Sequence, residues 1–312
     1  MPPTLPLEAS GELMHEGLVS VVIATYNMAR YLPFAMRSVL DQTYKNIEML
    51  VVDDGSTDDT RKAIAPFLGD ARVRFYVQEN KGQAAAKNCG VRHSKGDYIA
   101  FLDADDMWAP NKLELQVPLF ALGERIGVVY SRVSYIDETG RDLGRADNEL
   151  FRGCVSGPLL IRNFVGFGTV LVKRECFDRL GCFKETLPMG IDYDLWLKFS
   201  TQYDFDYIDR PLLHYRVWPG QMSKNTKARY LHGIEIMKNF LQEYPESVHK
   251  NIINEAWAHT YVGFGECVRD FDQSLGPAFG LYLRALRYKP NYLPAWKAMI
   301  KTVLWSPKRT RQ

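Results

Sequence analysis

The first hundred residues alternate short apolar segments with segments of helical periodicity. The apolar segments are residues 18–24, 47–52, 73–77 and 98–102, and their composition is typical of buried strands. Such a β-α-β-α-β-α-β order predicts a parallel sheet with right-handed crossovers, in which every strand ends at the same edge. The alternation therefore predicts an α/β fold with one edge at which the residues that follow the strands converge.

Polar and acidic residues follow three of these four segments. They are Thr25, Tyr26, Asp53, Asp54, Asp103, Asp105 and Asp106. On an extended backbone Asp103 and Asp105 point to the same side, and their carboxylates repel each other unless a cation joins them. Oxygen ligands of this kind suit Mg²⁺ or Mn²⁺. A surface turn rich in Asp is the alternative interpretation of this stretch, since turn signals are common.

The same edge lacks the glycine-rich loops that bind phosphates directly. No G-x-G-x-x-G follows the first strand and no G-x-x-x-x-G-K-[ST] occurs, which argues against dinucleotide and P-loop sites. The acids would repel a phosphate-bearing ligand unless a divalent metal bridged carboxylate and phosphate. We therefore expect a nucleotide diphosphate held through Mg²⁺ or Mn²⁺, with the metal assisting the leaving group and Asp53 or Asp54 accepting hydrogen bonds from base or ribose.

The composition argues against several other classes of protein. Lys and Arg number 39 and Asp and Glu 37, and this near balance gives no support to nucleic-acid binding. The five cysteines are odd in number and lack C-x-x-C spacing, so a reducing compartment fits better than a disulfide framework or a zinc site. Residues 1–17 contain no apolar signal core, and no apolar run approaches the length of a membrane helix. We expect a cytoplasmic protein, at most peripheral at the membrane.

In the second half of the chain the sequence pattern is less regular and predicts strands, loops and helices in a mixed order. Apolar strands are expected at residues 126–130 and 166–172, with a loop or hairpin at 137–150 between them. Residues 206–217 predict a pair of strands broken at Pro211, because proline cannot donate a hydrogen bond within a sheet.

From about residue 226 the pattern is helical alone. Trp257, Tyr261, Tyr282 and Pro290 stand at spacings that resemble one tetratricopeptide unit, and a plain helical hairpin explains them equally well. Either way, we expect the segment to pack on the preceding domain. The final residues mix bases with apolar side chains, which fits either a solvated end or weak attachment to an anionic membrane surface. These residues are Ile300, Lys301, Val303, Leu304, Trp305, Lys308, Arg309 and Arg311.

Four motifs occur in an order that closely resembles glycosyltransferase family 2. They span residues 19–27, 51–60, 80–88 and 102–106. The resemblance is continuous over about residues 18–120 and sparser to about residue 225. It implies an inverting transferase of the GT-A fold, in which a mostly parallel central sheet is flanked by helices and the donor is a nucleotide-activated sugar.

The resemblance also implies a division of the chain. Residues 1–17 would be a flexible N-terminal tail, and residues 18–225 the GT-A catalytic domain. Within that domain, residues 18–110 would bind the nucleotide and residues 111–225 the acceptor. Residues 226–312 would be an all-helical C-terminal extension.

On the donor side, the resemblance implies a role for each matching position. Thr25, Tyr26 and Asp53 would bind the nucleoside, with Asp54 close by. Lys87, at a position where the family often has Arg, would contact the nucleotide.

The metal motif is matched by Asp103 and Asp105, with Asp105 as the direct ligand and Asp103 nearer the ribose. Arg216 would meet the diphosphate from a mobile loop. Trp218 stands where the family often has His, so a metal here would rely on water or on His214, or would bind weakly.

The catalytic base is expected at the start of a helix. Inversion by single displacement requires a base for the acceptor hydroxyl, and the resemblance implies that Asp192 is this base. Ile191 replaces the Glu that usually precedes it, which puts an acceptor contact from that position in doubt. Asp194 is interpreted as a structural acid of the helix N-terminus.

The sequence thus predicts a metal-dependent hexosyl- or N-acetylhexosaminyltransferase. Its donor would be a UDP-sugar, with dTDP and GDP as alternatives, and its acceptor a saccharide or lipid-linked saccharide in polysaccharide or glycolipid synthesis at the cell envelope. A catalytically degenerate scaffold is the alternative, suggested by Ile191 and Trp218. A nucleotidyltransferase is disfavoured because no basic glycine-rich loop follows the first strand.

Overall fold

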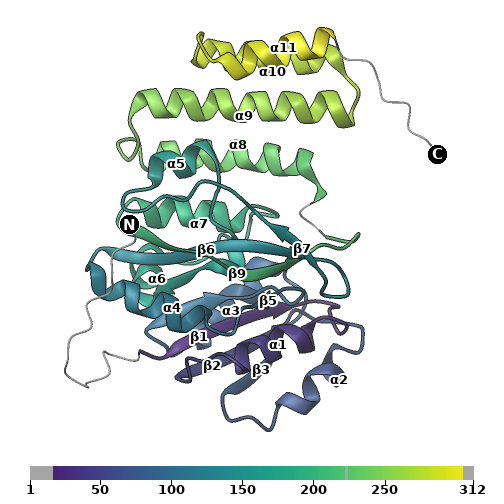
Figure 1. The fold of residues 1–312 in the computed structure, drawn as a ribbon, viewed down its shortest axis with the longest axis vertical. Coiled ribbons are helices and arrows are strands. Elements are labelled where there is room, and N and C mark those ends of the chain that lie inside the picture. The colour runs from purple at the N-terminus through teal and green to yellow at the C-terminus, as the bar shows by residue number, and fades with distance from the viewer. Residues whose placement is uncertain (1–16, 222–223, 305–312) are drawn as a thin grey trace.

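The computed structural model describes residues 17–221 and 224–304. The predicted N-terminal tail, apart from Gly17, and the basic residues Lys308, Arg309 and Arg311 lie outside the described residues. A twisted sheet with helices on both faces carries a stack of further helices on one side (Figure 1). None of the helices within the described ranges is long and apolar enough to cross a membrane.

The first half of the chain forms the predicted alternation of strands and helices, and the second half adds further strands and then helices alone. The strands are β1 (Val19–Thr25), β2 (Ile47–Asp53), β3 (Val73–Val77), β4 (Tyr98–Phe101), β5 (Met107–Trp108), β6 (Ile126–Ile136), β7 (Asp142–Arg145), β8 (Leu171–Lys173) and β9 (Asp204–Arg216). The α-helices are α1 (Leu32–Leu40), α2 (Thr60–Ile64), α3 (Gln83–His93), α4 (Lys112–Gln116), α5 (Ser156–Ile161), α6 (Arg174–Leu180), α7 (Ile191–Ser200), α8 (Thr226–Glu243), α9 (Lys250–Phe271), α10 (Leu275–Tyr288) and α11 (Leu293–Val303). Short 3₁₀ helices are η1 (Ala65–Phe67), η2 (Val117–Leu122) and η3 (Phe167–Thr169).

The sheet is parallel in its first half and mixed in its second. The strand order is β3-β2-β1-β4-β8-β6-β9-β5, with β7 paired to β6. All pairs from β3 to β4 are parallel, as predicted, so the ends of β1, β2 and β4 share one edge. Strand β8 is antiparallel to both of its neighbours, whereas β6 and β9 run parallel to each other.

Two segments differ from the sequence expectation. The predicted pair of strands around Pro211 is one long strand, β9, because Pro211 lies opposite Arg132 where the β6–β9 register shifts. A proline at such an irregularity removes no regular ladder hydrogen bond. The predicted strand at 166–172 shortens to β8, because residues 167–169 form η3 instead.

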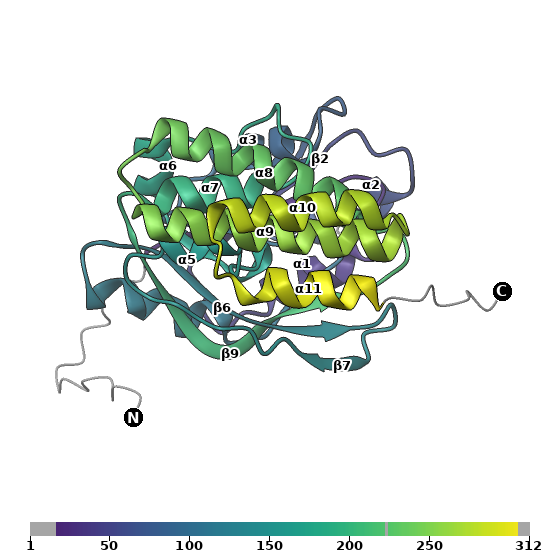
Figure 2. The ribbon, with the colours of Figure 1, turned by 90° about the horizontal axis from the view of Figure 1, so that it is seen from above.

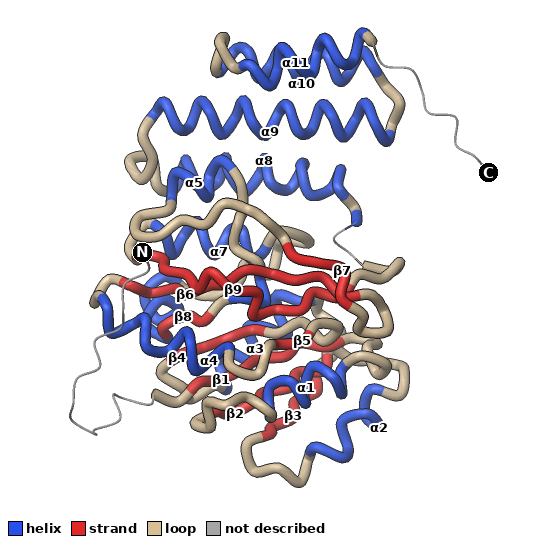
Figure 3. Tube along the Cα trace, in the orientation of Figure 1, coloured by secondary structure: helices blue, strands red, loops and turns tan. Residues whose placement is uncertain are grey.

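The helical end of the chain shares a core with the sheet. Figure 3 shows that the region from α8 to α11 contains no strand. One buried apolar cluster extends from Phe101 and Val128 in the sheet, through Trp196 of α7 and Trp257 of α9, to Tyr282 of α10. Seen from above, α10 and α11 lie side by side on the outside of this stack (Figure 2).

Candidate active site

The ends of β1 and β2 lie next to each other at the carboxyl edge of the sheet. Thr25 pairs in register with Asp53. Thr25 Oγ1 is buried and has no hydrogen-bond partner among the described residues, whereas the Tyr26 side chain is 45% exposed. Asp53 is buried, and its Oδ1 accepts a hydrogen bond from the Ser56 amide at 2.9 Å. The residues predicted to bind the nucleoside therefore lie together, and one of them carries an unsatisfied hydroxyl.

Asp54 faces a different set of partners. Its Oδ1 accepts hydrogen bonds from Gln78 Nε2 at 2.8 Å and from the Lys81 amide at 2.9 Å. Its Oδ2 accepts from the amide of Gly82, whose φ of +88° positions the start of α3, at 2.8 Å. Both carboxylate oxygens are thus engaged in the loop that precedes α3. This placement makes Asp54 a support of that loop, and its predicted position close to the nucleoside stays a prediction.

Lys87 is the buried cation of the edge. It lies on α3, and its ammonium is 3.1 Å from Asp103 Oδ1 and 4.0 Å from the centre of the Phe167 ring. Gln83 Oε1 accepts a further hydrogen bond from it at 3.0 Å. Burial raises the pKa of Asp192, which lies in the first turn of a helix nearly ninety residues beyond the metal motif in the chain, and the Lys87 charge is one of the smaller effects that oppose this shift. Lys87 therefore pairs directly with Asp103, and Asp192 feels its charge without a direct ion pair between them.

Asp192 lies in the first turn of α7, directly after Gly190 and Ile191. Burial raises the pKa of the Asp192 carboxyl, while hydrogen bonds and the Lys87 charge act in the opposite direction. One of these bonds comes from Asn163, whose Nδ2 donates to Asp192 Oδ2 at 3.0 Å. Sequence reasoning did not identify Asn163, because no motif marks this loop residue.

The other residues of this turn have structural surroundings. Ile191 is buried in the apolar core, so the position that often carries Glu in family 2 contributes packing here. Burial raises the pKa of Asp194, and Lys198 and Lys184 are the cations that counteract it. This agrees with the interpretation of Asp194 as a helix acid.

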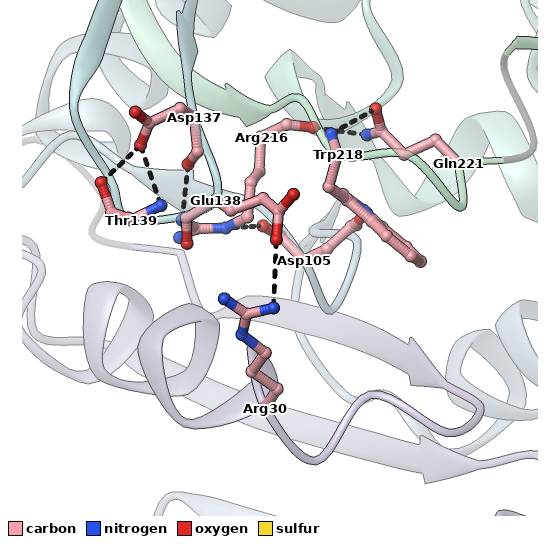
Figure 4. Close-up of polar contacts among 8 residues, drawn as sticks. All are labelled: Arg30, Asp105, Asp137, Glu138, Thr139, Arg216, Trp218 and Gln221. Carbon is pink, nitrogen blue, oxygen red and sulfur yellow. Dashed lines mark hydrogen bonds and ion pairs between the residues drawn. The ribbon is translucent and has the colours of Figure 1, made fainter.

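Trp218 contacts the metal motif directly (Figure 4). Its indole Nε1 donates a hydrogen bond to Asp105 Oδ2 at 2.7 Å. The Trp218 amide in turn donates to Gln221 Oε1 at 3.2 Å, and the ring lies 5.9 Å from the Tyr31 ring. The residue that replaces the usual His therefore occupies one oxygen of the predicted metal ligand.

Arg216 is buried and surrounded by carbonyl oxygens (Figure 4). Its Nε donates to the Asp105 carbonyl at 2.8 Å, and its Nη1 donates to the carbonyls of Asp137 and Glu138 at 3.0 and 3.2 Å. Its backbone amide donates to Asp106 Oδ1 at 2.9 Å. The guanidinium fastens the metal motif to the β6–β7 turn. The guanidinium is engaged by these carbonyls, and the predicted contact between Arg216 and the diphosphate stays a prediction.

The metal hypothesis fits these residues in part. Burial and then the charge of Asp103 raise the pKa of Asp105, and a cation beside both carboxylates would oppose this effect. His214, the imidazole considered as a further ligand, has its Nδ1 2.7 Å from Ser134 Oγ, and burial lowers its pKa. No group of three His, Cys, Asp or Glu side chains that could hold a metal occurs in residues 17–221 and 224–304. A metal would therefore have two protein carboxylates and would complete its shell with water or donor oxygens.

The model of the family described as Glycosyl transferase family 2 matches residues 20–175. The chain belongs to this family, and the predicted family and fold are confirmed.

Individual relatives and structures agree with this assignment. The chain is 31% identical over 236 residues, 75% of its length, to an uncharacterized glycosyltransferase of Rickettsia felis. It spans only 34–38% of the length of that relative and of two other Rickettsia relatives. It is 30% identical to the Escherichia coli UDP-Glc:alpha-D-GlcNAc-diphosphoundecaprenol beta-1,3-glucosyltransferase WfgD, covering 73% of this chain and 88% of WfgD. The crystal structure of S. aureus TarS 1-349 in complex with UDP-GlcNAc shares the fold, with a TM-score of 0.62 at 19% identity over 92% of this chain and 81% of TarS 1-349.

Proposed function

We propose that this protein is an inverting glycosyltransferase that moves a sugar from a UDP-sugar to a hydroxyl group of a saccharide acceptor. The observation that carries the proposal is the convergence at the carboxyl edge of the sheet, where Thr25 pairs in register with Asp53 and where β4, which leads into Asp103 and Asp105, lies beside β1. Lys87 pairs with Asp103, and its charge is one of the smaller effects on the pKa of Asp192, so the proposal places the base close to the donor site. A single displacement requires such closeness, because the base removes the acceptor's proton while the leaving group departs.

On the donor side, Thr25, Tyr26 and Asp53 bind the nucleoside in this proposal. The unsatisfied Thr25 Oγ1 forms a hydrogen bond to the base or ribose, and the exposed Tyr26 ring covers the base. A uridine carrier is supported by the UDP-GlcNAc bound in the TarS structure and by the UDP-glucose donor in the name of WfgD.

On the acceptor side, Asp192 is the general base. As the acceptor oxygen bonds to the anomeric carbon, its proton moves to the Asp192 carboxylate, and the bond to the diphosphate breaks with its electron pair leaving on the nucleotide. Burial raises the pKa of Asp192, which strengthens it as a base, while Lys87 and Asn163 favour its ionised form.

Mg²⁺ or Mn²⁺ is the proposed cofactor, and Asp105 and Asp103 would hold it. When bound, the ion supplies positive charge to the diphosphate leaving group. Arg216 is a positioning residue in this proposal, because it holds the Asp105 backbone without presenting its guanidinium to the donor. Trp218 weakens metal binding, because its indole N–H already bonds to one Asp105 oxygen.

For the acceptor, we propose a saccharide carried on a lipid, as the name of WfgD describes for that relative. The product would enter polysaccharide or glycolipid synthesis at the cytoplasmic face of a membrane.

The specific observations that favour the scaffold alternative are the buried Ile191 and the contact between Trp218 and Asp105. Metal-dependent binding of a nucleotide diphosphate separates the two readings.

A thermal-shift panel tests the proposed function. With UDP and Mn²⁺ each in about a hundredfold excess over its Kd, we expect Tm to rise by about 5 °C, since a ligand that binds only the folded state stabilises it by mass action. GDP, dTDP and CMP should give smaller shifts, and Asp105→Asn should remove the Mn²⁺-dependent part. The transferase proposal fails if no nucleotide diphosphate stabilises the protein in a metal-dependent manner.

Replacing Trp218 with His is expected to tighten Mn²⁺ binding by about tenfold. The change removes the indole hydrogen bond to Asp105 and offers an imidazole nitrogen, a common metal ligand, at the same position. Titration of free Mn²⁺ by electron paramagnetic resonance, with UDP present, measures the change. Trp218→Phe is the matched control, because it removes the N–H without adding a ligand. Equal affinity in all three proteins would show that Trp218 does not limit metal binding.

A further inference from the structure

Helix α11 buries its small side chains and exposes its large apolar ones. Ala295, Ala298 and Thr302 face the protein and are at most 3% exposed. Leu293, Trp296, Ile300, Val303 and Leu304, the last directly after the helix, are between 48% and 78% exposed. A helix that only completes a core does the reverse, because its large apolar side chains face inward. The exposed stripe therefore indicates a surface that binds something apolar.

Helix α10 continues this surface. It lies beside α11 at the end of the molecule that is farthest from β1, β2 and β3 (Figures 1 and 2). On α10, Leu283 is 52% exposed, and Arg287 stands one turn further along the same side. We call the exposed side chains of both helices the outer face; its principal members are Leu283, Arg287, Trp296, Lys297, Ile300 and Lys301.

The outer face has a charge of one sign. The 40 residues after Asp272 contain no Asp or Glu, although the chain as a whole has 37 of them. Of the bases on α10 and α11, Arg284, Arg287, Lys297 and Lys301 form no ion pair with any residue that the structure describes. Helices α10 and α11 therefore carry bases and no acids, although Glu255 of the neighbouring α9 pairs with Lys289.

The exposed apolar and basic side chains of α11 occupy separate, adjacent strips of the helix surface. At 100° per residue, Trp296, Ile300, Leu293 and Leu304 form one stripe, and Lys297 and Lys301 lie along its edge. The Trp296 ring is held in place, because its Nε1 donates to the Pro290 carbonyl at 3.0 Å. A preorganised Trp, aliphatic side chains and flanking lysines match the boundary between lipid headgroups and acyl chains.

We propose that the outer face of α10 and α11 docks on the surface of an anionic phospholipid bilayer. The apolar stripe enters the acyl boundary, and the unpaired bases contact headgroup phosphates. The uniform positive charge favours this partner over a second copy of the chain, whose outer face would repel it. The inference extends the proposed use of a lipid-linked acceptor, because it places the enzyme on the surface that carries such an acceptor.

Vesicle co-sedimentation of the full chain tests the proposal. With vesicles of phosphatidylcholine and phosphatidylglycerol at 7:3, we expect binding that weakens as NaCl is raised, and much weaker binding to pure phosphatidylcholine. Trp296→Glu with Ile300→Glu, and separately Lys297→Glu with Lys301→Glu, should each reduce the partition coefficient at least tenfold. The variants change exposed side chains only, and circular dichroism checks their folding.

Two control variants carry changes of the same kind elsewhere on the surface. Leu122→Glu alters an exposed apolar residue on η2, and Arg61→Glu with Lys62→Glu reverses two exposed bases on α2. Both should bind vesicles like the wild type. Equal binding by all variants, or no binding to anionic vesicles, would overturn the proposal. So would a dimer that the α11 variants dissociate. The assay contains no nucleotide, so its failure leaves UDP binding, and with it the proposed function, to be judged separately.

Discussion

Replacing Asp192 with Asn should reduce kcat for sugar transfer by about 10²–10⁴-fold and leave UDP binding within about twofold of wild type. The size follows from the usual contribution of a general base, since the amide is nearly isosteric but cannot accept the acceptor's proton. Its hydrogen bond from Asn163 can persist through the amide oxygen. Steady-state transfer to a saccharide acceptor, with UDP affinity from calorimetry, measures both quantities.

Asp194→Asn is the control for this experiment, because it lies two residues along the same helix beside other cations. It should retain most of its activity. Loss of UDP binding in Asp192→Asn would assign a structural role to Asp192. Full activity of Asp192→Asn would show that another residue is the catalytic base.

The pH dependence gives a second view of the same carboxylate. A base works in its ionised form, so activity should fall as pH drops through the pKa of Asp192, which burial raises. Asn163→Ala removes a hydrogen bond that lowers this pKa, so the acidic limb of the kcat/KM profile should shift to higher pH. Asn148→Ala, which removes a bond to the Phe164 carbonyl nearby, should leave the limb in place. If the acidic limb does not move in Asn163→Ala, the hydrogen bond from Asn163 does not affect the pKa of the catalytic base.

Asp54→Ala is expected to destabilise the fold by about 3 kcal/mol. The buried carboxylate accepts three hydrogen bonds from the loop before α3, and its removal leaves the Lys81 and Gly82 amides without their acceptor. Urea unfolding monitored by circular dichroism measures the loss. Asp59→Ala is the comparison, because Asp59 forms only a solvent-exposed pair with Lys62 and should change stability little. If Asp54→Ala is as stable as the wild type but binds UDP more weakly, Asp54 contacts the nucleotide, as the sequence predicts.

The sequence alone determined the parallel half of the sheet and the convergence at its edge. The period of each apolar run and the order of the elements are local properties, and parallel pairing then fixes that β1, β2 and β4 end together. The proximity of Thr25 and Asp53 followed from this reasoning. The family motifs added the GT-A fold, which the comparisons confirm.

Only the tertiary structure decided what each polar side chain touches. The predicted donor roles of Asp54 and Arg216 stay predictions, whereas the partners that both side chains have come from the loop before α3 and the β6–β7 turn, which no local pattern specifies. The contact between Trp218 and Asp105 joins residues 113 positions apart, and the exposure of large side chains on α11 depends on what α9 and α10 leave uncovered. Hydrogen-bond partners and burial are set by packing over long sequence separations, whereas periodicity records only the neighbours along one element.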